Sequence, residues 1–192
     1  MGTTTPYHHG SLRRALHDAA LRLIAEHGAD AFTLKQAAAE AGVSVAAPYR
    51  HYGGKADLLG ALAAEGFTLL ADRLRAAAAA EDPAQALLDA GLAYLAFADE
   101  HRAHFEVMFH NRGREPRAEG AVALDVLGGV IARLEAAGRL AVPPPAALRA
   151  AWASVHGLAV LRHGGMRTVV DDDPRSLRDE VLAPLLSGGL LR

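Results

Sequence analysis

The feature that most constrains this chain is a helical periodicity of apolar residues, which glycine and proline cut into segments. Near the N-terminus, Leu12, Leu16 and Leu23 recur at spacings that place them on one face of an α-helix. Runs of β-branched and aromatic residues that alternate with polar ones, which would predict strands, are missing. We therefore predict an all-α fold.

Local signals predict where the first helices begin and end. Ser11 can cap the first helix, and Gly28 is placed to end it. Thr33 and Gln36 form the pattern of a capping box, in which each side chain accepts a hydrogen bond from a backbone amide of the other residue. Gly42 is expected to stop the short helix that they start.

The rest of the chain predicts one more short helix and then longer ones. Ser44 can cap a helix that runs to about Tyr52, and Gly53 and Gly54 then break the chain. Further helices are expected between the remaining glycine and proline positions. They are predicted at 55–80, 83–99, 102–111, 116–138, 145–163 and 174–187, which makes about nine helices in all. Pro184 could kink or shorten the last of them.

Composition excludes several classes of protein. The 192 residues include no cysteine, which excludes disulfides, thiolate catalysis and zinc held by sulfur. No signal peptide is visible at the N-terminus, and no apolar stretch is long enough to span a bilayer. We therefore expect a cytoplasmic protein with no membrane partner.

Charge is distributed unevenly along the chain. Residues 1–55 carry six Lys or Arg against four Asp or Glu, whereas the rest carries fourteen against eighteen. Both lysines, Lys35 and Lys55, and five of the ten histidines lie in this first segment. A positively charged N-terminal part favours contact with phosphates, although chance placement would give the same pattern.

The most informative stretch is residues 33–55. It predicts two short helices joined by a tight, glycine-containing turn over residues 42–44, which is the geometry of a helix-turn-helix. The second helix starts with small residues that let the backbone approach base edges. Arg50 could reach a phosphate or a guanine edge. The residues that could reach phosphates on either side are Tyr49, His51 and Lys55.

This stretch resembles the DNA-binding domain of the TetR family of bacterial repressors. The resemblance is carried by residues 33–44 (TLKQAAAEAGVS) and 49–59 (YRHYGGKADLL). It implies that residues 1–55 form a three-helix, helix-turn-helix domain that binds a double-stranded DNA operator. It also implies that residues 56–192 form a helical bundle for ligand sensing and dimerisation.

The resemblance assigns individual residues to DNA. It implies that the helix start at Thr33 contacts a phosphate, and that Arg50 and the small residues at the start of the second helix face the major groove. The full set of residues predicted to bind DNA is Thr33, Lys35, Ser44, Val45, Ala46, Ala47, Tyr49, Arg50, His51 and Lys55. Two residues depart from the family pattern: Tyr52 stands where Phe is commoner, and Pro48 lies in the second helix. We expect a stiff, unbroken helix, because Pro48 falls in or beside its first turn.

A second resemblance lies downstream, in residues 101–109 (HRAHFEVMF) and 152–158 (WASVHGL). Both segments resemble the C-terminal domain of a branch of the family that is marked by a Trp…His-Gly signature. Residues near them could line a pocket for a small, mostly apolar effector, although core packing would explain most of them. The candidate ligand-binding residues are Tyr94, Phe97, His104, Phe105, Met108, Phe109, Trp152 and His156.

The resemblance also implies a homodimer that is formed by the last two helices. Their apolar stripes consist of Leu148, Ala151, Val155, Leu177, Val181, Leu182 and Leu185. A dimer presents two recognition helices to half-sites about 34–36 Å apart, or a multiple of that distance, so the operator should be palindromic. Repression relieved by the effector, through the helix at 55–80, is the regulation that the resemblance implies.

Two other functions stay open: a DNA-binding protein without an effector and, less favoured, a helical enzyme that uses histidines. No nucleophile elbow, phosphate-binding glycine loop or zinc-protease helix is present, so we predict no enzymatic activity and no cofactor. His101, His104 and His110 have a conceivable metal-ligand spacing. A surface or pocket role is the simpler interpretation of these histidines, and we predict no metal.

Overall fold

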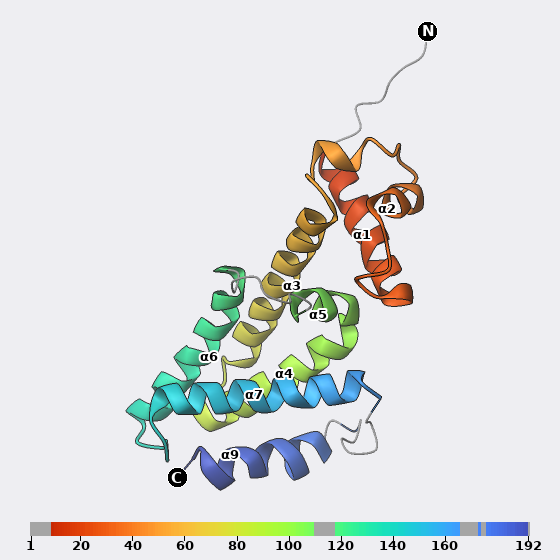
Figure 1. Cartoon of the computed structure of the whole chain (residues 1–192). Coiled ribbons are helices and arrows are strands. Elements are labelled where there is room, and N and C mark those ends of the chain that lie inside the picture. Colours follow the sequence, from red (N-terminus) through yellow and green to blue (C-terminus); the bar gives the residue numbers. More distant parts are fainter. Residues whose placement is uncertain (1–8, 110–117, 166–172, 174–175, 192) are drawn as a thin grey trace. The chain divides into compact units, whose positions relative to one another are not determined.

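The computed structural model describes residues 9–109, 118–165, 173 and 176–191. The predicted all-α fold is confirmed (Figure 1). The elements are α1 (His9–His27), α2 (Leu34–Glu40), the 3₁₀ helix η1 (Pro48–Arg50), α3 (Lys55–Ala77), α4 (Pro83–Glu100), α5 (Arg102–Phe109), α6 (Ala118–Ala136), α7 (Pro144–His163), the π-helical segment η2 (Leu177–Leu182) and α9 (Ala183–Gly189). Within the described ranges, no helix has the length and hydropathy that crossing a membrane would require.

Contacts between residues divide the chain into two compact units. The first unit comprises residues 1–66 and 102–115, and the second comprises residues 67–101 and 116–192. α5 therefore belongs with the N-terminal helices, although it follows α4 in the sequence. The functional boundary predicted between residues 55 and 56 stays a prediction, because contacts within the chain do not test which part binds DNA or ligand.

In the first unit, local signals set most ends of α1 and α2. Gly28 and Gly42, which follow these helices, have φ values of +83° and +69°, in the left-handed region that favours glycine. The predicted capping box is confirmed: Gln36 N–H donates to Oγ1 of Thr33 over 3.2 Å, and Gln36 Oε1 accepts from Thr33 N–H over 2.8 Å. The predicted cap at Ser11 was wrong, since α1 begins at His9. A serine marks a helix start only weakly, because it also occurs within helices.

α5 is held in the first unit by α1 and α3. The carboxylate of Glu106 accepts a hydrogen bond over 2.6 Å from the backbone N–H of Ala29, just beyond the end of α1. Gly66 brings the backbone of α3 so near to α5 that an added Cβ would lie 2.6 Å from Sδ of Met108. Glu106 and Ala29 are 77 positions apart in the sequence. The first unit is thus completed by a segment from the middle of the chain.

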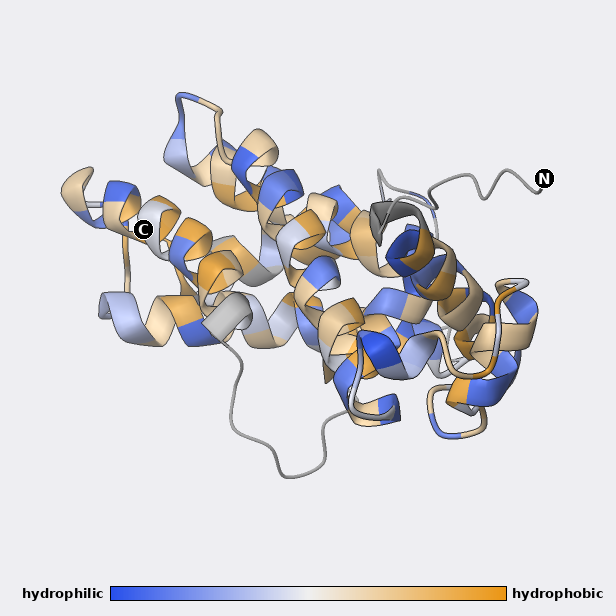
Figure 2. Ribbon diagram, turned by 90° about the horizontal axis from the view of Figure 1, so that it is seen from above, coloured by the Kyte–Doolittle hydropathy of each residue, from blue (hydrophilic) through white to orange (hydrophobic). Residues whose placement is uncertain are grey.

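In the second unit, α4, α6 and α7 pack around an apolar core. Leu134 and Ala147 are fully buried there, and Ile131 is nearly so. Figure 2 shows hydrophobic and hydrophilic residues alternating along the helices, as expected where each helix buries one face. Full burial of one Leu or Ile side chain contributes about 1.5–3 kcal/mol, so this core is the main source of stability in the unit.

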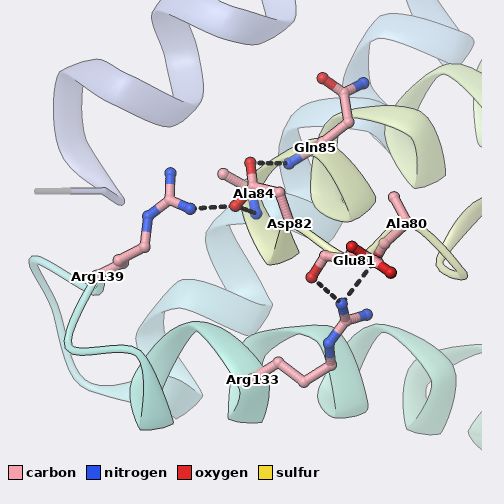
Figure 3. A network of polar contacts seen from close by, with 7 residues as sticks. All are labelled: Ala80, Glu81, Asp82, Ala84, Gln85, Arg133 and Arg139. Carbon is pink, nitrogen blue, oxygen red and sulfur yellow. Dashed lines mark hydrogen bonds and ion pairs between the residues drawn. The ribbon is translucent and has the colours of Figure 1, made fainter.

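Two arginines fasten the turn between α3 and α4 to α6 and its C-terminal end (Figure 3). Arg133 of α6 donates to three backbone carbonyl oxygens of this turn over 2.5–2.9 Å. Arg139, just beyond α6, pairs with Asp82, whose carboxylate also caps the N-terminus of α4. Carbonyl groups beyond a helix end need such partners, and the two arginines therefore fix the start of α4.

The longer helices are confirmed within a few residues, except at the C-terminal end. Residues 174–187 were predicted to form one α-helix, but the described part begins as η2 and continues as α9 to Gly189. Pro184 explains this difference. It has no N–H to donate, and its ring would collide with the carbonyl of Glu180 in a regular α-helix. The predicted ends at 110–111 and 116–117 lie outside the described residues.

Candidate nucleic-acid interface and apolar cavity

The segment between α2 and α3 is wound more tightly than predicted. The sequence predicts a helix from Ser44 to about Tyr52, but the regular part is limited to η1. Ala47 N–H donates to the carbonyl of Ser44 over 2.9 Å, and Arg50 N–H donates to the carbonyl of Ala47 over 3.2 Å. Pro48 has no N–H for an α-helical bond, and its ring would clash with the carbonyl of Ser44. A short, tight turn therefore stands where we expected a stiff helix.

We call residues 44–51 the exposed turn. The side chains of Val45 and Tyr49 are 48% and 58% exposed. His51 is half-buried at the end of the turn. Ala47 was predicted to face the major groove, but it is buried within the unit together with Pro48. The other residues of the turn that are exposed are Ser44, Ala46 and Arg50.

The remaining residues predicted to bind DNA lie at the starts of α2 and α3. Thr33 and Lys35 are exposed. Lys55 is half-buried, and its Nζ donates to the backbone oxygen of Asp30 over 2.8 Å. The same Nζ lies 4.6 Å from the centre of the Phe32 ring, within the range of a cation–π contact. Lys55 thus ties the loop between α1 and α2 to α3, a role that the sequence reasoning missed.

The sequence reasoning also missed two residues next to the exposed turn, His17 and Glu65. The ring of Tyr52 is 4% exposed, and its hydroxyl lies 2.7 Å from Nε2 of His17. Nδ1 of His17 lies 2.6 Å from Oε2 of Glu65. A signal was present in the sequence, because a buried phenol hydroxyl needs a hydrogen-bond partner. Tyr52 in place of Phe therefore predicts a polar neighbour, although not which one.

The second unit contains an apolar cavity of about 30 Å³. It lies among residues of α3, α4, α6, α7, η2 and α9, and none of the described residues that line it carries a charged side chain. Gly91 of α4 leaves part of this space open. A Cβ added to Gly91 would lie 3.3 Å from Leu182 and 3.4 Å from Val155.

The residues with polar groups that line this cavity are Tyr94, Trp152 and Ser154, and His156 lies next to Tyr94. The hydroxyl of Tyr94 lies 2.9 Å from Nδ1 of His156. The Tyr94 ring meets the Trp152 ring edge to face, with 5.3 Å between the ring centres. Burial raises the pKa of Tyr94 and lowers the pKa of His156, since it disfavours the charged form of each. Both groups are therefore neutral at physiological pH.

The residues predicted to bind ligand fall into two groups. Tyr94 and Trp152 line the cavity, and His156 is hydrogen-bonded to Tyr94. Phe97 is fully buried in the same unit, but it is not among the residues that line the cavity. The predicted residues on α5 belong to the first unit instead. They are His104, Phe105, Met108 and Phe109.

Three of the residues predicted to form the dimer interface are buried within the protomer. Ala151, Leu177 and Leu182 are 5%, 4% and 2% exposed, so they pack in the core of the protomer. The predicted residues that are half-buried are Leu148, Val155 and Val181, and the side chain of Leu185 lies outside the described residues. The large apolar residues of α7 that are exposed are Val160 and Leu161, at 50% and 36%. Sequence periodicity did not single out these two.

The histidines give no candidate metal centre in the part of the chain that the structure describes. No group of three or more His, Asp or Glu residues there is arranged to hold a metal ion. His104 is buried on α5, and His101 is half-buried beside the ring of Phe97, with 5.0 Å between the ring centres. His110 lies outside the described residues.

Two family models match the chain. The model of "Bacterial regulatory proteins, tetR family" matches residues 16–62, and the model of "Tetracyclin repressor-like, C-terminal domain" matches residues 87–185. The first match contains α2, the exposed turn and the start of α3, and the second contains Tyr94, Trp152 and His156. A search of curated protein sequences finds no significant match.

Several solved structures are similar in fold. A protein of unknown function from Rhodococcus sp. RHA1 is 31% identical, with a TM-score of 0.82, and the match covers 98% of this chain and 100% of that one. SmeT, the repressor of the Stenotrophomonas maltophilia multidrug efflux pump SmeDEF, is 23% identical, with a TM-score of 0.70 and coverages of 94% and 90%. A SmeT–triclosan complex matches at 23% identity, with a TM-score of 0.67 and coverages of 95% and 92%.

Proposed function

The chain belongs to the TetR family of bacterial regulatory proteins, and from this premise we propose that it is an effector-released repressor. It binds a palindromic operator as a homodimer, and a small, uncharged, apolar effector releases it. Membership of the family makes the chain a DNA-binding regulator and not an enzyme. We further infer that it belongs to the branch marked by a Trp…His-Gly signature, which Trp152, His156 and Gly157 supply.

The exposed turn is the observation that carries the DNA-binding part of this function. Val45 and Tyr49 expose large side chains on this short segment. The buried side chains of Ala47 and Pro48 anchor the segment to the rest of the unit. Small residues at its start let the backbone approach base edges, and Arg50 is exposed at its end. Tyr49 and the exposed Lys35 are placed to contact phosphates.

The experiment that tests DNA binding is selection of bound duplexes from a random pool. The expected product is an inverted repeat with half-site centres about 34–36 Å apart, or a multiple of that distance, because a two-fold dimer reads two equal half-sites. Affinity for this duplex should fall steeply as salt rises, since basic residues displace counterions from phosphates. An enriched sequence without two-fold symmetry would contradict the homodimer.

The cavity in the second unit supports the proposed class of effector. Its described lining is apolar and uncharged, and Tyr94 and His156 offer one neutral pair of hydrogen-bonding groups. A charged ligand would lose its hydration there without gaining a counter-charge. An uncharged aromatic or aliphatic compound with one polar group suits this lining, and triclosan, which is bound in the SmeT complex, is a suitable first probe.

The size of the cavity bears on how an effector would act. A volume of about 30 Å³ holds little more than a water molecule, whereas pockets for small ligands measure about 300–1,000 Å³. An effector must therefore displace side chains, and it binds an open state in preference to the closed one. Such a difference in affinity is what a ligand needs in order to shift an equilibrium between two states.

Gly91→Ala is expected to weaken the response to effector while operator affinity stays unchanged. The added Cβ meets Leu182 and Val155 at 3.3 Å and 3.4 Å and narrows the cavity. Overpacking of this kind costs about 1–3 kcal/mol, so the effector concentration for half-release should rise about tenfold. It is measured by fluorescence titration of the protein–operator complex with compounds that release the wild type, beginning with triclosan.

Gly129→Ala is the matched control for this measurement. Gly129 lies in α6, and a Cβ there would meet nothing within 4 Å. Both substitutions stabilise a helix by up to about 1 kcal/mol, so only crowding of the cavity separates them. Equal responses of the two variants would place the effector elsewhere, and a chain that no compound releases would be a DNA-binding protein without an effector.

Val160→Asp is expected to convert the dimer to monomers. Val160 and Leu161 form an exposed apolar patch on α7, and an aspartate buried there between two copies would be an unpaired charge. The mass in sedimentation equilibrium should fall to about half at micromolar concentration. Val122→Asp, on an exposed position of α6, is the control and should stay dimeric. A dimer that survives Val160→Asp would exclude this face of α7.

A further inference from the structure

A chain of polar contacts in the first unit connects the exposed turn to α3. The Tyr52 hydroxyl, directly after the turn, lies 2.7 Å from Nε2 of His17 on α1. On the other side of the imidazole, Nδ1 lies 2.6 Å from Oε2 of Glu65 on α3. The His17 side chain is 16% exposed and the Tyr52 ring is nearly buried. The three groups come from three different segments and meet at one histidine.

The chemistry of these groups fixes the direction of the hydrogen bond between His17 and Glu65. An ionised carboxylate can only accept hydrogen bonds, so Nδ1 of His17 must carry a proton that it donates to Glu65. In the neutral imidazole, Nε2 is then an acceptor, and it accepts the hydrogen bond from the Tyr52 hydroxyl. Glu65 thereby selects the form of His17 that can hold Tyr52, as second partners of histidines do in other protein sites.

Glu65 has a second neighbour in the same unit. Its Oε1 lies 3.6 Å from Nε2 of His104 on α5, and His104 is buried. α5 is held to the end of α1 by the hydrogen bond between Glu106 and Ala29. The carboxylate that orients His17 therefore lies near both α1 and α5.

We propose that His17 is a positioning residue for DNA recognition: held by Glu65, it fixes Tyr52 and so the exposed turn that presents Arg50. The inference rests on the proposed binding of DNA by this turn. The backbone hydrogen bonds of the turn are all short-range, and its regular part is the three-residue η1, so its conformation also depends on buried anchors in its middle and at its C-terminal end. The side chains of Ala47 and Pro48 are buried and anchor the middle of the turn. The buried ring of Tyr52 anchors its C-terminal end.

The expected cost of losing this anchor follows from the population of the binding-competent turn. When only a fraction of molecules has the competent conformation, the apparent dissociation constant rises by the inverse of that fraction. One buried hydrogen bond corresponds to a change of about three- to tenfold in such an equilibrium. Tyr52→Phe removes one hydroxyl and leaves the ring, so operator affinity should fall roughly three- to tenfold per half-site.

The test compares operator affinity with stability in five variants of the full chain. Tyr52→Phe and His17→Leu should both weaken binding, and the double variant should be no worse than His17→Leu, because both substitutions remove the bond between Tyr52 and His17. His17→Gln keeps one donor and one acceptor and should recover part of the affinity. His27→Gln, at an exposed histidine of the same helix, should bind as the wild type does.

Two spectroscopic measurements complete the test. The ¹⁵N shifts of His17 in the wild type should show that the neutral imidazole carries its proton on Nδ1 and not on Nε2. Amide signals of residues 45–51 should broaden in Tyr52→Phe without DNA. The inference would be overturned if Tyr52→Phe and His17→Leu lost thermal stability but kept full operator affinity. If the wild type binds no DNA, the proposed function fails, and unchanged amide signals in Tyr52→Phe would still separately refute the positioning role of His17.

Discussion

Arg50→Ala is expected to lower operator affinity more than any other single substitution in the exposed turn. Arg50 is exposed at the end of η1, where its guanidinium can bond both acceptors of a guanine edge. Such a contact contributes about 1–3 kcal/mol. A dimer makes it twice, so the loss should be about 2–6 kcal/mol, or roughly 30-fold and more.

The measurement has two parts. Titration of the selected operator gives the affinity, and a repeated selection with Arg50→Ala gives the base preference, which should be lost at one position of each half-site. Arg22→Ala is the control, because Arg22 is an exposed arginine of α1 that pairs with Glu40. If Arg50→Ala weakens binding but leaves the base preference unchanged, Arg50 contacts a phosphate and not a base.

Asp99→Ala is expected to destabilise the second unit by about 3 kcal/mol. Arg162 of α7 is 7% exposed, and its Nη2 donates to Asp99 of α4 over 2.5 Å. His163 lies on the other oxygen of the same carboxylate, with its Nε2 3.7 Å from Oδ1. Removal of the carboxylate leaves the buried cation without this counter-charge, which is far more costly than loss of a surface pair.

Urea unfolding measures this effect, with Asp72→Ala as the matched control. Asp72 pairs with Arg75 on the surface of α3, where both side chains are more than half exposed, and such a pair contributes about 0–1 kcal/mol. The double variant Asp99→Leu/Arg162→Met should recover most of the stability, because it also removes the buried charge. If Asp99→Ala costs no more than Asp72→Ala, the pair is solvated and contributes little to stability.

The fold could be predicted because its signals are local. The capping box at Thr33 and the left-handed glycines at 28 and 42 depend on neighbours within a few residues, and so does the start of α4 at Pro83. The two departures, η1 and η2, both lie at a proline. In each case the sequence showed where the proline lies. Whether the chain there forms a 3₁₀ helix, a π-helix or a shifted α-helix depends on the surrounding packing.

The candidate site could be predicted only in part, because burial depends on partners far away in the sequence. The exposed positions of Tyr49 and Arg50 agree with the pattern of the motif. Ala47 and Leu182 could not be placed, because the side of a helix or turn that meets a neighbour depends on the whole unit. His17 and Glu65 are 48 residues apart, so the sequence could suggest only that Tyr52 needed some polar partner.

The place of α5 in the first unit has a consequence for how the nascent chain folds. Residues 1–66 leave the ribosome first, but α5 follows only after the 35 residues 67–101, which take about 2–7 s to translate. Until then the backbone N–H of Ala29 lacks the Glu106 carboxylate, and the side of α1 that α5 covers is open to water. The first unit is thus begun first and completed only after α4 has been synthesised.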